Sequence, residues 1–173
     1  MTRRHIHYEA AFEDYLRSQG MPYVAVDEAK KAIFSGERIK SFDFLVYGKR
    51  RQAFLVDVKG RKFPYLTDGA KRYWENWVAQ EDIDDLERWQ GVFGSDFVAT
   101  FVFAYWLTDS DRRWPDAPPH PYRGEYYAFL SIPVGDYAQH TRPRSQKWGT
   151  VSLPTKEFKR LAKPFGQSIG SSV

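Results

Sequence analysis

The sequence predicts a single α/β domain whose mixed β-sheet is flanked by helices. Its 173 residues, 42% hydrophobic and 28% charged, suit one domain with a packed core. Segments with helical and with strand periodicity follow one another, and the most apolar segment, 97–107, is typical of a central strand. We expect the domain to cover residues 1–165 and the remainder, 166–173 (GQSIGSSV), to be a flexible tail.

The first part of the chain predicts a helix, a short strand and a hairpin. Apolar side chains recur at helical spacing across residues 8–18, and a glycine and a proline end this helix. A short strand follows at 23–26. Two β-rich runs, 41–47 (SFDFLVY) and 52–58 (QAFLVDV), are separated by a glycine and three charged residues, which predicts a hairpin turn.

The second part predicts a helix, the central strand and a mixed tail. The helix, running from 81 to about 93, opens with the acidic run EDIDD, whose charge favours the positive end of the helix dipole. A metal-binding role for this run is the less favoured alternative. Four prolines make 109–122 a loop. Further strands are expected at 72–78, 125–132 and 148–153, and a short basic helix at 155–162, capped by Thr155 and ended by Pro164.

The net charge of +4 is unevenly distributed along the chain. Residues 1–48 are neutral, 49–62 carry +5, 63–117 carry −6 and 118–173 carry +5. The average therefore neither requires nor excludes a polyanionic partner, whereas the basic segments are compatible with one.

Composition excludes several classes of protein. Cysteine is absent, which excludes thiolate zinc sites, a thiol nucleophile and disulfides, and is compatible with a reducing compartment. The longest apolar run, 97–107, is too short to span a bilayer, and no apolar leader precedes the first helix. We expect a cytoplasmic protein that does not bind a membrane.

Two carboxylates interrupt the β-rich runs of the predicted hairpin. Asp43 lies within the first run, Asp57 lies near the end of the second, and Lys59 follows two positions later. In a hairpin that is symmetric about position 50, Asp43 and Asp57 lie opposite each other on one face. Lys59 has the parity of Asp57 and points to the same face. Buried carboxylates are costly without compensation, so the pair requires a cation.

Hard oxygen ligands with no cysteine and no nearby histidine suit Mg²⁺ or Mn²⁺ rather than zinc. Such a metal lowers the pKa of a bound water and stabilises the oxyanions of a phosphodiester, and a neighbouring lysine holds or helps to deprotonate that water. The pattern is therefore typical of a hydrolase. A plain salt bridge between Asp57 and Lys59 at a strand end is the alternative.

This arrangement resembles the PD-(D/E)XK nuclease superfamily, with its restriction-endonuclease-like fold, and in particular its Holliday-junction-resolvase-like branch. The resemblance covers residues 7–107: a helix with a glutamate, a strand with the first aspartate (SFDFLV), a strand with the D-x-K motif (FLVDVKGRK), a helix and an apolar strand. The sequence departs from the written motif at Phe42, which stands where the family has proline.

The resemblance implies roles for individual residues. The catalytic set would be Glu9, Asp43, Asp57 and Lys59. Asp43, Asp57 and the backbone carbonyl of Val58 would bind Mg²⁺ or Mn²⁺, Glu9 would complete the acidic cluster, and Lys59 would position the attacking water.

Two further polar residues are candidates for the site. Glu13, one helical turn after Glu9, is the competing candidate for the helix carboxylate. Gln90, on the following helix, resembles a polar residue that some relatives direct at the site, and a solvent-facing glutamine is the alternative.

Contact with DNA phosphates is expected from basic residues around the motif. They are Lys49, Arg50, Arg51, Arg61, Lys62, Lys71 and Arg72. The last part of the chain adds Arg142, Arg144, Lys147, Lys156, Lys159, Arg160 and Lys163. For each of them a solvated surface position is the alternative. Trp148 is expected in the core or an interface, and Trp114, in the proline-rich loop, is the candidate for stacking on a base.

The preferred hypothesis is a Mg²⁺-dependent endonuclease that hydrolyses DNA phosphodiester bonds, with junctions or branched DNA as the implied substrates. A nucleic-acid-binding module of the same fold, inactive alone or working in a larger assembly, is the main alternative. A structural or small-ligand domain is the third. The sequence does not distinguish DNA from RNA, and it allows a homodimer.

Overall fold

A computed structural model describes residues 3–26, 32–34, 37–67, 71–108, 115 and 118–170, and in several of these segments the backbone alone. The helices are α1 (Arg3–Ser18), α2 (Gln80–Phe93), α3 (Val134–Ala138), α4 (Thr155–Leu161) and α5 (Phe165–Gly170). The strands of the main sheet are β1 (Tyr23–Ala25), β4 (Phe44–Tyr47), β5 (Ala53–Phe63), β9 (Phe97–Leu107), β10 (His120–Tyr122), β11 (Glu125–Pro133) and β14 (Lys163–Pro164). Among the described helices, none combines the length and apolarity needed to cross a lipid bilayer.

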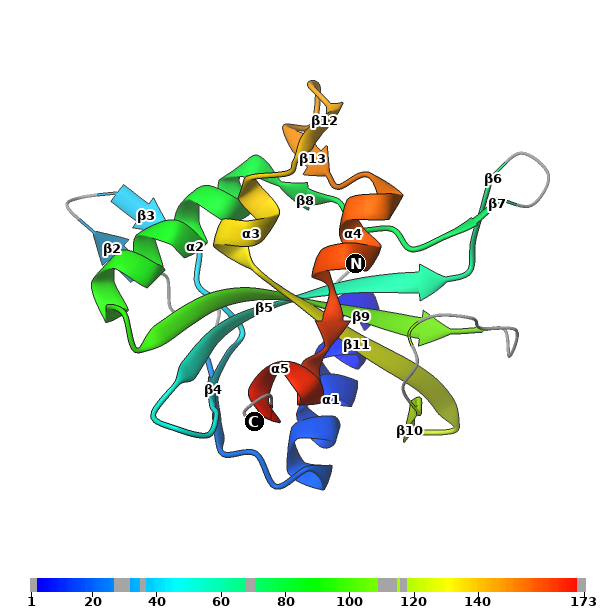
Figure 1. Cartoon of the computed structure of the whole chain (residues 1–173), viewed down its shortest axis with the longest axis horizontal. Helices are drawn as coiled ribbons and strands as arrows, with labels where there is room; N and C mark the ends of the chain where they lie inside the picture. The colour runs from blue at the N-terminus through cyan, green and yellow to red at the C-terminus, as the bar shows by residue number, and fades with distance from the viewer. Residues whose placement is uncertain are drawn as a thin grey trace.

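The described strands of the main sheet have the order β1-β4-β5-β9-β11-β10, with β14 beside β11. Figure 1 shows β5, β9 and β11 side by side across the middle of the protein. β9 therefore lies at the centre of the sheet, as its composition predicts. β5 and β9 are parallel over eleven residues each, and α2 makes the crossover between them. All other pairings in this sheet are antiparallel, so the predicted mixed sheet is confirmed.

The hairpin of β4 and β5 has the register predicted from the sequence. Phe44 pairs with Val56 and Tyr47 with Ala53, which is symmetric about position 50. β5 continues five residues beyond the predicted end, because its second half pairs with β9 and not with β4.

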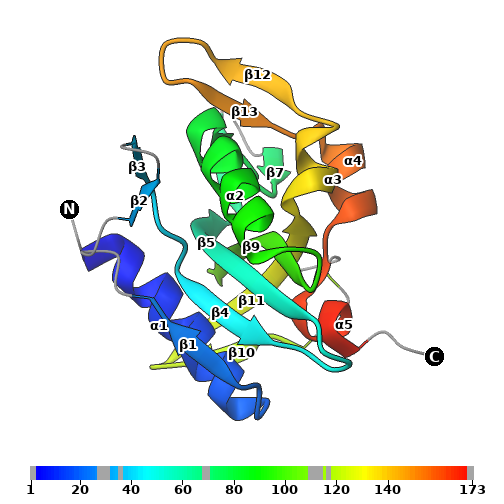
Figure 2. The same cartoon turned by 90° about the vertical axis from the view of Figure 1, so that its left-hand side faces the viewer.

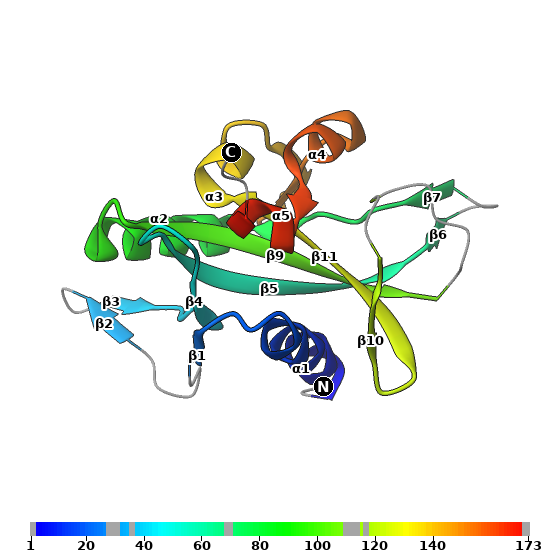
Figure 3. The ribbon, with the colours of Figure 1, turned by 60° about the horizontal axis from the view of Figure 1, so that its bottom comes forward.

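Helices cover both faces of the sheet, and Figure 3 shows α1 below the sheet and α2, α3 and α4 above it. Side chains of β5 alternate between these two layers. Phe54, Val56 and Val58 pack with α1, whereas Leu55 and Phe63 pack with the residues of α2 and α4. Asp57, Lys59 and Arg61 have odd numbers and therefore belong to the α2 face.

The described strands form three small sheets outside the main sheet. β8 (Val78–Ala79), β13 (Thr150–Ser152) and β12 (Arg142–Ser145) form one of them, and its outer hairpin projects from the body of the protein (Figure 2). The other two are the hairpins β2 (Ala32–Phe34) with β3 (Glu37–Ile39) and β6 (Tyr65–Thr67) with β7 (Lys71–Tyr73).

The structure corrects several expected elements. The strand expected at 72–78 is divided between β7 and β8, and its middle is an irregular segment in which Trp74 and Asn76 are buried. Pro154 takes the N-cap position of α4, so Thr155 does not cap it. Regular structure continues through Gly170 in α5, within the segment expected to be a tail.

The contact between α1 and β5 depends on a glycine. A Cβ atom on Gly60 would lie 2.1 Å from Cδ2 of Tyr8, far inside van der Waals contact, so the Tyr8 ring sits directly on the β5 backbone. Tyr8 itself is buried. The close approach places α1 directly over the residue that follows Lys59.

We expect Gly60→Ala to lower the free energy of unfolding by about 2 kcal/mol, because the added methyl displaces the buried Tyr8 ring. Gly91→Ala is the matched control. Gly91 lies in α2, and a methyl group there would meet no atom within 4 Å beyond the helix itself, so its replacement is expected to raise stability by up to about 1 kcal/mol through helix propensity. Urea denaturation of both variants makes the comparison, and equal stability of Gly60→Ala and the wild type would contradict the packing of α1.

Candidate active site

A largely buried ammonium, that of Lys59, connects β5 to α2. Nζ of Lys59 lies 2.9 Å from Oδ2 of Asp57 and 2.7 Å from Oδ2 of Asp82. The other oxygen of Asp82, Oδ1, lies 2.7 Å from Nζ of Lys40. We call these four residues, Lys40, Asp57, Lys59 and Asp82, the Lys59 cluster. Asp57 and Lys59 thus share a face, as their parity predicts.

The cluster keeps its central groups charged. Burial acts to lower the pKa of Lys59, but the carboxylates of Asp57 and Asp82 outweigh burial and raise this pKa to about 12. Burial acts to raise the pKa of Asp82, but Lys59 and Lys40 outweigh it and lower this pKa below its ordinary value. Lys59 is therefore a fixed cation at neutral pH.

Asp43 lies at the point where β4 separates from β5. It is 5% exposed and immediately precedes β4, rather than lying inside the strand as expected. Its N–H donates to the Val56 carbonyl at 2.8 Å, and its Oδ2 accepts a hydrogen bond from the Val58 N–H at 2.6 Å. The N–H groups of a strand lie in the plane of the sheet. The Asp43 carboxylate, which accepts from one of them, therefore lies in that plane next to β5 and does not project from the same face as the Asp57 side chain.

The Val58 carbonyl points to the same side of β5 as its N–H group, because both groups of one strand residue face the same neighbour. That neighbour, at this level, is the Asp43 carboxylate. Asp43 and the Val58 carbonyl thus lie on the same side of β5, and Asp57 is the residue that precedes Val58.

Helix α2 fixes the segment that leads to Asp43. The Lys40 N–H donates to Oδ2 of Asp85 at 3.1 Å, and Nε1 of Trp89 donates to the Lys40 carbonyl at 3.0 Å. Asp82 also accepts from the Ala79 N–H at 3.3 Å, at the start of α2. The acidic run therefore does more than meet the helix dipole, because its buried members, Asp82 and Asp85, bind side chains and backbone from elsewhere in the chain.

Sequence reasoning missed Asp82 and Lys40 as members of the site. The available signal was helical periodicity. Asp82 and Asp85 flank the apolar residues Ile83 and Leu86, so they lie at the border of the buried face of α2.

The donor set suits a hard divalent cation. Carboxylates and a backbone carbonyl are the oxygen ligands that Mg²⁺ and Mn²⁺ prefer, and neither cysteine nor histidine is needed. Within the described residues, however, no three acidic, histidine or cysteine side chains gather as a metal-binding group. A cation here would be held by two aspartates and the Val58 carbonyl, with Asp57 shared with Lys59.

Glu9 and Glu13 lie on α1, which covers the opposite face of β5 from Asp57. Glu13 is bound at the far end of the helix, where Oε1 lies 2.8 Å from Nη2 of Arg17 and accepts from the Tyr23 hydroxyl at 2.8 Å. Glu9 is half-buried, adjoins Tyr8 and lies one turn nearer to Gly60. The bonds of Glu13 to Arg17 and Tyr23 hold its carboxylate away from the Lys59 cluster, and the role of Glu9 as the helix carboxylate stays a prediction.

Gln90 is not directed at the cluster. Its Nε2 donates to the carbonyls of Gly94 and Phe97, and its Oε1 accepts from the Ala99 N–H at 2.6 Å. These bonds join the end of α2 to the start of β9. Neither the site role nor the solvent-facing alternative describes this residue.

The burial of Arg61 contradicts its expected place among the phosphate contacts. Arg61 is 7% exposed, its guanidinium carbon lies 4.1 Å from the centre of the Trp77 ring, and it donates to the carbonyls of Gly60 and Trp77. Burial lowers the pKa of Arg61. It is thus a packing residue that joins β5 to the segment before α2.

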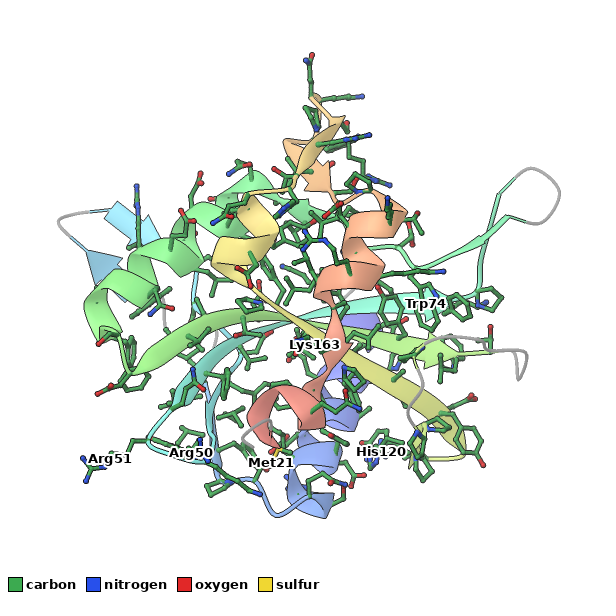
Figure 4. All side chains as sticks on the ribbon, in the orientation of Figure 1. Met21, Arg50, Arg51, Trp74, His120 and Lys163 are labelled. Carbon is green, nitrogen blue, oxygen red and sulfur yellow. The ribbon has the colours of Figure 1, made fainter. Side chains whose placement is uncertain are left out.

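The other expected cations do not surround the Lys59 cluster. Lys49, Arg50 and Arg51 are exposed on the β4–β5 turn, and Figure 4 shows Arg50 and Arg51 at the end of the molecule opposite β12 and β13. Lys62 is exposed over the Trp106 ring, with Nζ 5.5 Å from its centre. The side chains of Lys71 and Arg72, and the whole of Trp114, lie outside the described residues.

We expect Asp82→Asn to lower the free energy of unfolding by about 2 kcal/mol at pH 7, because Lys59 and Lys40 lose a charged partner. The folded-state pKa of Asp82 is below its unfolded value of 3.8, so its contribution is present above pH 4 and is lost as the pH falls through the folded-state pKa. The difference in stability between the two proteins should therefore begin to shrink as the pH falls below 4.

Urea titrations at pH 7, 5 and 3.5 measure this difference. Asp84→Asn is the control, since Asp84 is exposed two positions later on α2 and accepts a hydrogen bond from the Gln80 side chain of the same helix. A constant difference between Asp82→Asn and the wild type over this pH range would contradict the ion pairs of Asp82.

Comparison with known proteins gives the fold a precedent. No protein-family model matches the sequence, and no curated protein matches it. Among solved structures, the chain is similar to Hjc, a Holliday junction resolvase from the archaeal hyperthermophile Archaeoglobus fulgidus, with a TM-score of 0.55 and 16% identity. The similarity covers 95% of this chain and 99% of that one, so the whole described architecture is that of the resolvase fold.

Proposed function

We propose that the protein is a metal-dependent endonuclease that hydrolyses phosphodiester bonds in branched DNA. One observation carries the proposal: on β5, Asp57 and the charged Lys59 lie 2.9 Å apart, and the residue between them, Val58, donates its N–H to the carboxylate of Asp43. The fold supports it, because the similar solved structure is that of a Holliday junction resolvase.

Mg²⁺ or Mn²⁺ would be held by Asp43, Asp57 and the Val58 carbonyl, with Glu9 completing the acidic set. When bound there, the ion would supply a water of lowered pKa and positive charge for the phosphate oxygens. Asp43 is already oriented by the Val58 N–H, which donates to one of its carboxylate oxygens.

Lys59 would act as a cation and not as a base. Its pKa, raised to about 12, keeps it protonated at neutral pH, so it donates hydrogen bonds to an attacking water or to a phosphate oxygen. Asp82 is a positioning residue, because it holds the lysine 2.7 Å from its own carboxylate without belonging to the D-x-K motif.

Phosphate groups along the DNA would meet the exposed cations Lys49, Arg50, Arg51 and Lys62. A homodimer would suit a substrate with two equivalent strands, and RNA stays an alternative substrate.

A DNA-binding module without hydrolytic activity is the second candidate function. It is favoured by the engagement of Lys59 with two carboxylates at once and by the small number of acidic side chains around Asp57 among the described residues. In that case the ion pairs are structural, and binding to DNA does not depend on a divalent metal.

Substitutions that keep the shape of the side chain test the enzyme directly. We expect Asp57→Asn and Lys59→Met each to reduce the rate of cleavage at least about 100-fold. The first variant removes a metal ligand, and the second removes the cation beside the reacting phosphate. Cleavage of labelled junction, flap, duplex and single-stranded DNA is followed with Mg²⁺, and a chelator should abolish it reversibly.

Glu13→Gln is the control, since Glu13 binds Arg17 and Tyr23 away from the site, and its cleavage rate should match the wild type. Cleavage that persists in Asp57→Asn, or in the presence of the chelator, would refute the proposed metal-dependent enzyme. Binding without cleavage of any DNA form, unchanged by the chelator, would support the binding module instead.

A further inference from the structure

The hairpin of β12 and β13 projects next to the Lys59 cluster. β13 pairs with β8, which leads directly into α2, and the Gln80 N–H donates to the Gly149 carbonyl at 2.9 Å. Asp82, two positions later, holds Lys59. The turn of the hairpin is therefore joined by backbone hydrogen bonds to the end of α2 that carries the candidate site (Figure 2).

The base of the hairpin is held by several specific contacts. Buried Asn76 donates through Nδ2 to the Leu153 carbonyl at 3.2 Å and accepts from the Leu153 N–H at 2.7 Å. The Tyr137 hydroxyl donates to the Asn76 carbonyl at 2.6 Å. The guanidinium carbon of Arg144 lies 4.9 Å from the centre of the Trp77 ring, the same ring that contacts buried Arg61.

An ordered turn presents a tryptophan to solvent at the tip. Trp148 is 71% exposed, the largest exposed fraction among the large hydrophobic side chains described. Its N–H donates to Oγ of Ser145 at 3.3 Å, and Gly149 closes the turn with a φ of 58°. Of the two positions expected for Trp148, the core and an interface, the structure excludes the core.

The hairpin is purely basic. No acidic residue occurs between Asp136 and Glu157, whereas Arg142, Arg144 and Lys147 are all exposed on the hairpin. Nζ of Lys147 lies 5.2 Å from the centre of the Trp148 ring. An indole with a lysine over its ring, on a hairpin that also carries two exposed arginines, matches the two parts of a nucleic acid, a base to stack on and phosphates to neutralise.

From this geometry we infer that the β12–β13 hairpin binds DNA beside the scissile phosphate, with Trp148 stacked on an unpaired or unstacked base. The inference rests on the proposed function for its ligand. Stacking on a base inside an intact duplex first requires that base to be unstacked, at a cost in free energy, whereas bases at a branch point or in a single strand are accessible. The hairpin thus selects DNA by structure, and the Lys59 cluster acts on the neighbouring backbone.

Fluorescence anisotropy tests the inference with the full chain and a labelled four-way junction, single strand and blunt duplex of matched sequence. A chelator is present, so that binding is measured without cleavage. Trp148→Ala is expected to weaken binding to the junction and single strand about tenfold and to leave duplex binding within about twofold. Trp148→Phe should retain most of the affinity. Arg142→Gln/Lys147→Gln should weaken all three complexes and reduce the salt slope by about two.

Tyr126→Ala is the matched control, because Tyr126 is a 52% exposed aromatic residue on β11, away from the hairpin. The affinity of Tyr126→Ala for every DNA form should equal that of the wild type. Equal affinity of Trp148→Ala and the wild type, or an equal loss for all three DNA forms, would overturn the stacking role. So would conversion of a dimer to a monomer by Trp148→Ala with DNA binding unchanged, since the tip would then be a protein interface.

The outcomes separate this inference from the proposed enzyme. Selective loss in Trp148→Ala without any Mg²⁺-dependent cleavage supports the hairpin and refutes the enzyme. Cleavage by the wild type together with full affinity of Trp148→Ala supports the enzyme and refutes the hairpin.

Discussion

The ammonium of Lys59 is largely buried, so its positive charge needs carboxylate partners, and this requirement fixes the positions of the surrounding elements. Asp57 supplies one carboxylate from the same strand, and α2 supplies the other through Asp82. Because Asp82 also binds Lys40, and Asp85 binds the Lys40 backbone, the compensation extends to the segment that ends at Asp43. Removing one partner leaves a charge in a poorly solvated place. Strand, helix and loop are therefore fixed relative to one another by electrostatics as well as by apolar packing.

Much of this architecture follows from local patterns. Strand periodicity and the charged, glycine-containing turn predicted the β4–β5 register, and the apolar run predicted β9 with its bounds. Asp57 and Lys59 were found because parity in a strand fixes the face. Asp82 was missed because its role depends on Lys59, 23 positions away, and Arg61 was misplaced because Trp77 and Tyr105 bury it from other segments. The segment 74–77 was expected to be a strand, but side chains of Tyr105 and Tyr137 bind its carbonyls in place of a neighbouring strand.

The structure also changes the interpretation of how the basic residues are distributed. The basic segment 49–62 suggested a phosphate-binding rim close to the motif, yet its cations divide between a distant turn, the α1 face and the interior. Besides Lys40, which belongs to the cluster, the exposed cations of the adjoining hairpin come from the last third of the chain, on β12 and the turn that follows. Position along the sequence is thus a weak guide to which charges face a common ligand, because the three-stranded sheet of β8, β13 and β12 connects segments about 70 residues apart.

From the two kinds of strand pairing around β5 we expect an order of assembly. β4 and β5 pair across a short turn, so this hairpin closes at small entropic cost, whereas Ala53 pairs with Phe97, 44 positions later, only after α2 has crossed the sheet. On this argument Asp43 joins the strand that carries Asp57 in an early, local step. Lys59 acquires Asp82 in a late, long-range step, and until then its charge is met by water and Asp57 alone. The residues that would perform chemistry are thus brought together in two stages. The two aspartates are placed first by the hairpin of β4 and β5, and α2 with Asp82 then fixes Lys59.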